Sequence, residues 1–90
     1  MPKVTVNYRV AILTVESDDD EGRLLINGLI RARIKLTPTT RLTSTVQTDY
    51  EWHELIEGTI KRKAGKVTLA IHANNVEIAL ETFSLQTYLE

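Results

Sequence analysis

The stretch from Gly65 to Glu90 constrains the fold of this chain most. In residues 67–72, VTLAIH, apolar residues alternate with polar or small ones, which is typical of a strand with one buried face. Asn74 and Asn75 follow, and an asparagine side chain can cap a helix by accepting a hydrogen bond from a first-turn N–H. The stretch therefore predicts a strand, a short turn and a helix.

The expected final helix, from Val76 to Leu89, carries two apolar stripes. The first has the i, i+3, i+4, i+7 spacing of a face that covers a sheet, and it comprises Val76, Ala79, Leu80 and Phe83. The second lies on roughly the opposite side and comprises Ile78, Leu85 and Leu89, with Tyr88 beside it. We expect this second stripe to be a protein interface, because an apolar surface on so short a chain needs a cover. The alternative is that an earlier helix of the same chain shields it.

Length and composition set outer limits on fold and function. Ninety residues, 1–90, predict a single domain. A domain of this size buries only about 60–65% of its unfolded surface, so association with a partner would help its stability. The absence of cysteine excludes disulfides, a thiolate nucleophile and a cysteine zinc site, and it fits the cytoplasmic location that we expect. A net charge of −1 and short apolar runs give no global attraction to nucleic acid and no membrane span.

The first half of the chain predicts a strand and then a helix. Residues 4–15, VTVNYRVAILTV, are rich in β-branched residues, as strands prefer. The acidic run at residues 17–21 is typical of a helix start, with Ser17 as N-cap and Asp20 as the capping-box acid. A helix of about fourteen residues should follow. Its inward residues are expected to be Leu25, Ile26, Leu29 and Ile30. The same acidic run could instead bind a divalent cation, although capping is the simpler interpretation.

The middle of the chain predicts extended structure. Residues 41–48, RLTSTVQT, are expected to form an edge strand or an ordered loop. Residues 55–63 predict a strand, and a tight turn at 63–66 would join it to the strand at 66–72, with Gly65 supplying a positive φ. The predicted fold is therefore α+β, in the order β-α-β-β-α. It comprises a small antiparallel sheet of three, possibly four, strands with two helices on one face.

The sequence offers little that could carry catalysis. His53 and His72 do not stand in a metal-binding spacing, and the glycines form no phosphate loop. No serine stands at a sequence spacing from a histidine that would indicate a catalytic pair. No pair of carboxylates lies in an apolar setting that would raise a pKa. We therefore expect no catalytic residue, no cofactor and no metal ion, and we predict that the protein is not an enzyme.

Four basic residues, Lys61, Arg62, Lys63 and Lys66, cluster around the predicted hairpin turn. Such a cluster can hold the phosphates of an RNA backbone by charge, with an affinity that falls steeply with salt. The alternative is a solvated turn whose charge discourages edge-to-edge aggregation. Tyr8, Tyr50 and Trp52 could stack on bases, or they could be core or interface residues.

The C-terminal half resembles the small Pcc-type subunit of the KEOPS complex. The resemblance rests on a hairpin turning at Gly65, the strand VTLAIHA, a short polar turn and a helix that ends in LQTYLE. The last helix of that family typically ends in a leucine, a small polar pair and Tyr-Leu, here Leu85, Gln86-Thr87 and Tyr88-Leu89. Two features depart from the family: residues 31–54 form a longer segment, and no aromatic residue follows Leu89.

The resemblance implies a non-catalytic assembly role. Subunits of this kind dimerise and dock their helices against the ATPase-fold catalytic subunit of the complex, which makes threonylcarbamoyladenosine in tRNA. The implied partners are a second copy or a paralogous small subunit, the catalytic subunit and possibly tRNA, with no membrane involved. The alternative function is a stand-alone nucleic-acid-binding domain that uses the basic hairpin.

Overall fold

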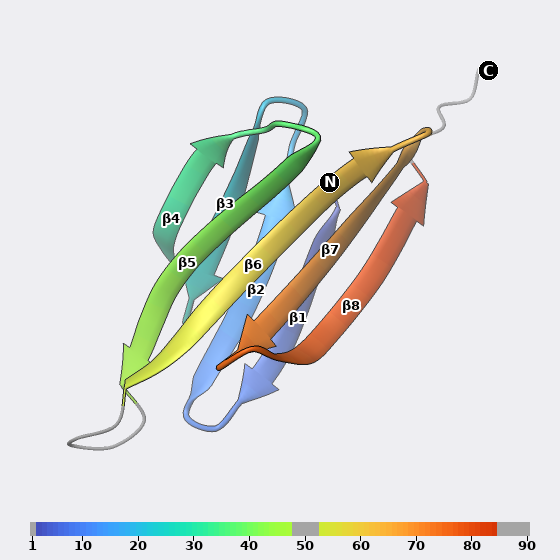
Figure 1. Cartoon of the computed structure of the whole chain (residues 1–90). Coiled ribbons are helices and arrows are strands. Elements are labelled where there is room, and N and C mark those ends of the chain that lie inside the picture. The colour runs from blue at the N-terminus through green and yellow to red at the C-terminus, as the bar shows by residue number, and fades with distance from the viewer. Residues whose placement is uncertain (1, 48–52, 85–90) are drawn as a thin grey trace.

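The structure, a computed structural model, describes residues 2–47 and 53–84, and within these ranges the chain forms strands and turns without a helix. The eight strands are β1 (Lys3–Tyr8), β2 (Ala11–Ser17), β3 (Glu21–Ile26), β4 (Leu29–Lys35), β5 (Thr39–Gln47), β6 (His53–Lys63), β7 (Lys66–Ala73) and β8 (Val76–Ser84). They form two four-stranded antiparallel sheets, β1-β2-β3-β4 and β5-β6-β7-β8, which we call sheet 1 and sheet 2 (Figure 1). The predicted α+β fold with the order β-α-β-β-α is therefore wrong, because the chain is all-β.

The first predicted helix is the β3–β4 hairpin. Asn27 and Gly28 have φ values of 53° and 82°, as both central residues of a type I′ hairpin turn require. The flanking apolar residues are paired across the hairpin, Leu25 with Ile30 and Ile26 with Leu29. Two apolar residues on each side of a two-residue turn have the spacing of a helical stripe, and this coincidence explains the wrong prediction.

The second predicted helix is β8, as far as the structure describes it. Asn74 and Asn75 have φ values of 50° and 68°, so they form a hairpin turn instead of capping a helix. Ile78 is an extra residue in β8, since Ile71 pairs with Ala79 while His72 pairs with Glu77. Such a bulge shifts the alternation of side chains by one position, which hides the two-residue period of the strand.

The segments that were predicted to be extended are strands in the structure, as far as it describes them. The predicted strand at 4–15 is extended, but it turns back at Arg9, whose φ is 54°, and so divides into β1 and β2. Of the segment predicted at 41–48, residues 41–47 belong to the edge strand β5, which confirms one of the two interpretations, and residue 48 lies outside the described residues. The hairpin of 55–63 and 66–72 is confirmed as β6 and β7, with Gly65 at a φ of 77°.

The two sheets pack face to face around one core. Strand β2 lies against β6 and β7, β1 lies against β8, and β4 lies against β5. The largest fully buried side chains come from both sheets: Leu13, Val15, Leu24, Ile56, Ile60, Val67, Leu69 and Ile71. The sheets approach so closely that a Cβ on Gly58 would lie 2.5 Å from Val15 Cγ2. Within the described ranges there is no helix of the length and hydropathy that a membrane crossing needs.

The sheets repeat one plan. In sheet 1 the Asn27 N–H donates to the Ile12 carbonyl at 2.8 Å, and the Asn27 side-chain oxygen accepts from the Ile12 N–H at 2.8 Å. In sheet 2 Asn74 makes the same two hydrogen bonds with Leu55, at 2.9 and 3.0 Å. The register also skips one residue at the matching place in each last strand, Arg31 in β4 and Ile78 in β8. Residues 36–38 link the two sheets.

Candidate functional site

The basic residues singled out in the sequence lie together at the closed end of the β6–β7 hairpin. Lys63 pairs with Lys66 across the Ala64-Gly65 turn, and Arg62 pairs with Val67. The molecule is elongated, with extents of 51 × 21 × 20 Å, and this hairpin forms one of its ends (Figure 1). The structure thus brings the four predicted cations, Lys61, Arg62, Lys63 and Lys66, to one projecting tip.

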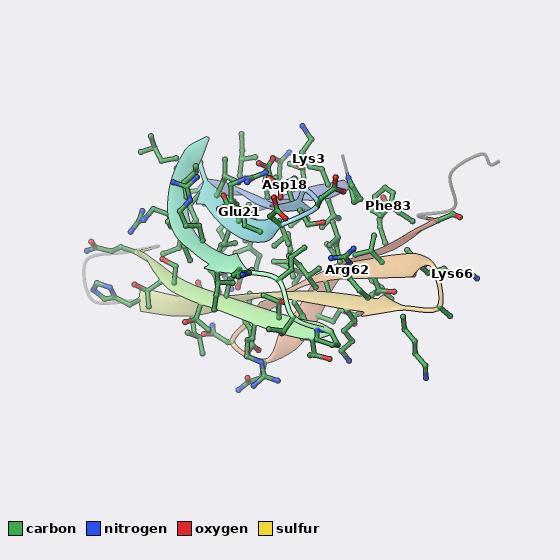
Figure 2. All side chains as sticks on the ribbon, turned by 90° about the horizontal axis from the view of Figure 1, so that it is seen from above. Lys3, Asp18, Glu21, Arg62, Lys66 and Phe83 are labelled. Carbon is green, nitrogen blue, oxygen red and sulfur yellow. The ribbon has the colours of Figure 1, made fainter. Side chains whose placement is uncertain are left out.

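The four cations project on both sides of the hairpin. Ile60 and Val67 point into the core, so the alternation of the strands places Lys61, Lys63 and Lys66 on the outer face of sheet 2. Arg62 lies on the other side, and its N–H donates to the Pro38 carbonyl at 2.9 Å. All four residues are exposed. Figure 2 shows Lys66 at the far end of the hairpin, while Asp18 and Glu21 lie on the other layer of the sandwich.

Within residues 2–47 and 53–84, the cations of this tip have no acidic partner. None of the ion pairs between described residues includes Lys61, Arg62, Lys63 or Lys66. The neighbouring cation, Arg41, differs because its Nε lies 2.9 Å from Glu57 Oε2. The tip is therefore a local positive patch on a chain whose net charge is only −1.

A shallow hollow of about 310 Å³ adjoins the patch on the outer face of sheet 2. Thr59 and Ala70 are directly paired and form part of its floor, while Lys61 and Arg41 belong to its rim. His72 lines the same hollow and is half-buried. Its Nδ1 is buried and has no hydrogen-bond partner in the described part of the chain.

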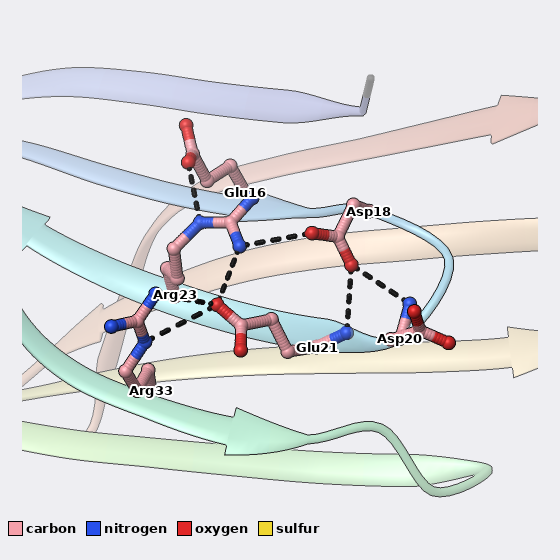
Figure 3. A network of polar contacts seen from close by, with 6 residues as sticks. All are labelled: Glu16, Asp18, Asp20, Glu21, Arg23 and Arg33. Atoms are coloured by element: carbon pink, nitrogen blue, oxygen red, sulfur yellow. Dashed lines mark hydrogen bonds and ion pairs between the residues drawn. The ribbon is translucent and has the colours of Figure 1, made fainter.

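The acidic run at residues 17–21 lies in the turn between β2 and β3 and does not cap a helix. The Asp18 carboxylate accepts hydrogen bonds from the N–H groups of Asp20 and Glu21, each at 2.8 Å, in the β2–β3 turn. The Arg23 guanidinium occupies the centre of the acidic cluster, at 2.7 Å from Glu16, 3.0 Å from Asp18 and 2.7 Å from Glu21 (Figure 3). No three metal-binding side chains converge within residues 2–47 and 53–84. The fixed cation replaces the divalent ion that we considered.

The hydrogen bonds of this network shift the pKa values of its own charged groups. The backbone N–H groups of Glu21 and Asp20, followed by the Arg23 side chain, lower the pKa of Asp18 to about 2. Hydrogen bonds from Arg23 and then Arg33 lower the pKa of Glu21, and the hydrogen bonds to Glu16, Glu21 and Asp18 raise the pKa of Arg23. These shifts favour the ionised forms of Asp18, Glu21 and Arg23, so the cluster holds paired charges across the β2–β3 turn.

A second polar cluster joins the two sheets at the opposite end of the molecule. Glu54 is 7% exposed, and its carboxylate accepts hydrogen bonds from the Tyr8 hydroxyl and, at 2.9 Å, from the Asn74 side chain. Arg9 Nε lies 3.0 Å from the same carboxylate. Tyr8 is therefore engaged in this cluster, which ties the β1–β2 turn to sheet 2.

The predicted protein interface falls largely outside the described residues. Leu85, Tyr88 and Leu89 lie there, as do Tyr50 and Trp52, which we had considered for stacking. Ile78 is described: it is half-buried in β8 and packs against the core. Sequence reasoning missed the edge strands β4 and β8, because those segments were interpreted as helices.

The chain was compared with protein-family models, curated proteins and solved structures. No protein-family model, no curated protein and no solved structure matches this chain.

Proposed function

We propose that this protein is a small non-catalytic binding domain that holds the phosphate backbone of a nucleic acid with its basic β6–β7 hairpin. One observation carries the proposal: four exposed cations gather on a projecting tip, and none of them takes part in an ion pair of the described residues. Lysine and arginine side chains that are free of acidic partners can neutralise phosphates and release their counterions.

The assembly role in a tRNA-modifying complex stays a prediction with weaker support, because the fold that accompanied it is wrong. It rested on a final helix and on the order β-α-β-β-α, and the described part of that helix is the strand β8. The comparisons add nothing in its favour. The alternative from the sequence, a stand-alone binding domain, depends only on the hairpin and its charges, and both are present.

The proposed contact is modest and electrostatic. Four cations can neutralise about four phosphates, which gives a slope of log K against log salt no steeper than about −3 on a single strand. The affinity should therefore fall by about 50-fold between about 50 and about 200 mM salt. No base edge needs to be recognised, so the binding is expected to depend little on sequence.

Charge reversal at the hairpin tests the proposal. We expect Lys63→Glu/Lys66→Glu to abolish binding of a fluorescein-labelled single-stranded RNA, measured by fluorescence anisotropy at low salt. The matched control, Lys3→Glu/Arg31→Glu, changes the net charge equally at exposed positions outside the hairpin and should bind like the wild type. Lys63→Arg/Lys66→Arg should also bind.

Two results would contradict the proposal. The first is a wild-type protein that shows no binding at low salt. The second is an affinity that falls equally in the hairpin variant and in its control, because this would reflect net charge alone.

A further inference from the structure

Strands β4 and β8 each have one edge that pairs with no other strand of the described chain. Each is the last strand of its sheet, and the two lie on opposite sides of the molecule (Figure 1). Both carry large apolar side chains that water reaches: Leu29 at 66% exposure, Ile30 at 47%, Ile34 at 47%, Val76 at 62% and Leu80 at 54%. An exposed edge of this kind is a template for pairing with another strand.

The charges of the two edges are opposite. Strand β4, LIRARIK, contains Arg31, Arg33 and Lys35 and no acid. Strand β8, VEIALETFS, contains Glu77 and Glu81 and no base. A pairing of two β4 strands or of two β8 strands would place like charges near each other, which is unfavourable in a sheet, whereas β4 beside β8 places opposite charges together.

We propose that copies of this chain assemble head to tail, with β4 of one copy pairing antiparallel with β8 of the next. This inference is independent of RNA binding by the hairpin. In the proposed register Arg33 stands opposite Glu77, Ile34 opposite Val76 and Ile30 opposite Leu80. The first is an ion pair and the other two are apolar pairs, and directly opposed pairs of both kinds stabilise antiparallel strands.

The faces of the two strands agree with this register. Arg33 pairs with Arg23 and Ile30 with Leu25 within sheet 1, and both positions lie on its outer face. Glu77 pairs with His72 and Leu80 with Ala70 within sheet 2, also on the outer face. Two residues separate Ile30 from Arg33 in β4, and two separate Glu77 from Leu80 in β8. One of the two is the extra residue of a bulge in each strand, so both strands keep the same side chains on the outer face.

The geometry favours an open chain of copies. In the sandwich β4 lies against β5, and β1 lies against β8. Pairing β8 of a second copy with β4 of the first therefore also brings β1 of the second copy beside β5 of the first. The free β4 of the second copy can then accept a third copy. An interface that joins two different surfaces extends in this way unless the rotation between copies closes a ring.

Two edge variants test the assembly. Ile30→Lys/Ile34→Lys makes β4 too charged to pair, and Glu77→Lys/Leu80→Lys gives β8 the same sign of charge as β4. Light scattering should show a wild-type mass that rises with concentration, and each variant alone should be a monomer. An equimolar mixture should form a 1:1 dimer and nothing larger, because only one intact β4 and one intact β8 remain to pair.

Ile12→Lys/Leu55→Lys is the matched control. It places two lysines at exposed apolar positions on the interior strands β2 and β6, and we expect it to assemble like the wild type. A wild-type protein that stays monomeric at every concentration would overturn the proposal, since the edge charges would then serve only to prevent pairing. Variants that dimerise alone, or a mixture that stays monomeric, would also overturn it.

A cross-linking experiment tests the register, and the absence of native cysteine makes it clean. Directly opposed residues of antiparallel strands have Cα atoms about 4.5–5.5 Å apart, which a disulfide can span. Under mild oxidation Ile30→Cys should therefore cross-link to Leu80→Cys in a mixture of the two single variants. Thr68→Cys, on the interior strand β7, should not cross-link to Ile30→Cys. Homodimers as abundant as the mixed dimer would overturn the register.

Discussion

Asp18 shows how a single residue makes the fold sensitive to acid. Hydrogen bonds from two backbone N–H groups and from Arg23 lower its pKa to about 2, below the value of about 3.9 for an unfolded aspartate. A carboxyl whose pKa is lower in the folded state favours folding above the unfolded pKa, and this contribution disappears as the pH falls through the folded pKa. The contribution of Asp18 is therefore complete at neutral pH and is lost between about pH 5 and pH 2.

We predict that Asp18→Asn is less stable than the wild type at pH 7 and that the difference narrows toward pH 2. Thermal unfolding at a series of pH values measures this, and a carbon-detected NMR titration gives the pKa of Asp18 directly. Parallel stability curves for the two proteins, or a pKa near 3.9, would show that the turn does not hold the ionised carboxylate.

Single residues also show what sequence can and cannot indicate about a site. Lys61, Arg62, Lys63 and Lys66 were placed together correctly because they are neighbours in sequence and flank a glycine turn. The burial of Arg23 could not be foreseen, because its partners Glu16, Asp18 and Glu21 converge only once β2 and β3 pair.

At the scale of strands and turns, the secondary-structure predictions were right where side chains alternate regularly and wrong where turns or bulges interrupt the alternation. The hairpin predicted for residues 55–72 was confirmed, because β6 and β7 alternate regularly and turn at Ala64-Gly65. The helix predictions failed where two-residue asparagine turns stand between apolar pairs and where the bulge at Ile78 interrupts the alternation. Asn-Gly between apolar segments is a strong hairpin signal, so Asn27-Gly28 was the signal that could have corrected the first helix.

The turn at Ala64 allows a stabilising substitution. Ala64 has a φ of 52°, a left-handed conformation that costs an ordinary residue about 1 kcal/mol or more. Asparagine tolerates this conformation, and Asn-Gly is the preferred type I′ pair. We predict that Ala64→Asn raises the free energy of unfolding by about 0.5–1 kcal/mol. Urea denaturation measures the change, and Ala64→Val is the control, because a β-branched residue there should be destabilising. Equal stability of all three proteins would mean that the turn is not strained.

At the scale of the whole molecule, the repeated plan of the two sheets is invisible in the sequence. The matching pairs, such as Asn27 with Asn74 and Ala32 with Ala79, are few, and the two halves differ in the lengths of their turns. What repeats is backbone geometry: the strand order, the asparagine hydrogen bonds and the bulge in the last strand. Backbone geometry can persist while side chains diverge, so pairing patterns show the repeat where residue identities do not.

Among the described residues, 36–38 form the covalent link between the two sheets, so cutting the chain there should leave two fragments, 1–37 and 38–90, that fold only together. Each fragment alone would expose the inner face of its sheet. In the intact chain the link holds each sheet at an effective concentration in the millimolar range relative to the other. Separate fragments at micromolar concentration lose about 4 kcal/mol of folding free energy, so their refolding should depend on concentration. Co-elution of the mixed fragments with recovery of the β-sheet circular dichroism signal tests this. A single fragment that folds as a monomer would contradict it. In this sense the protein is an intramolecular dimer, and the short link at residues 36–38 sets the effective concentration at which its two halves associate.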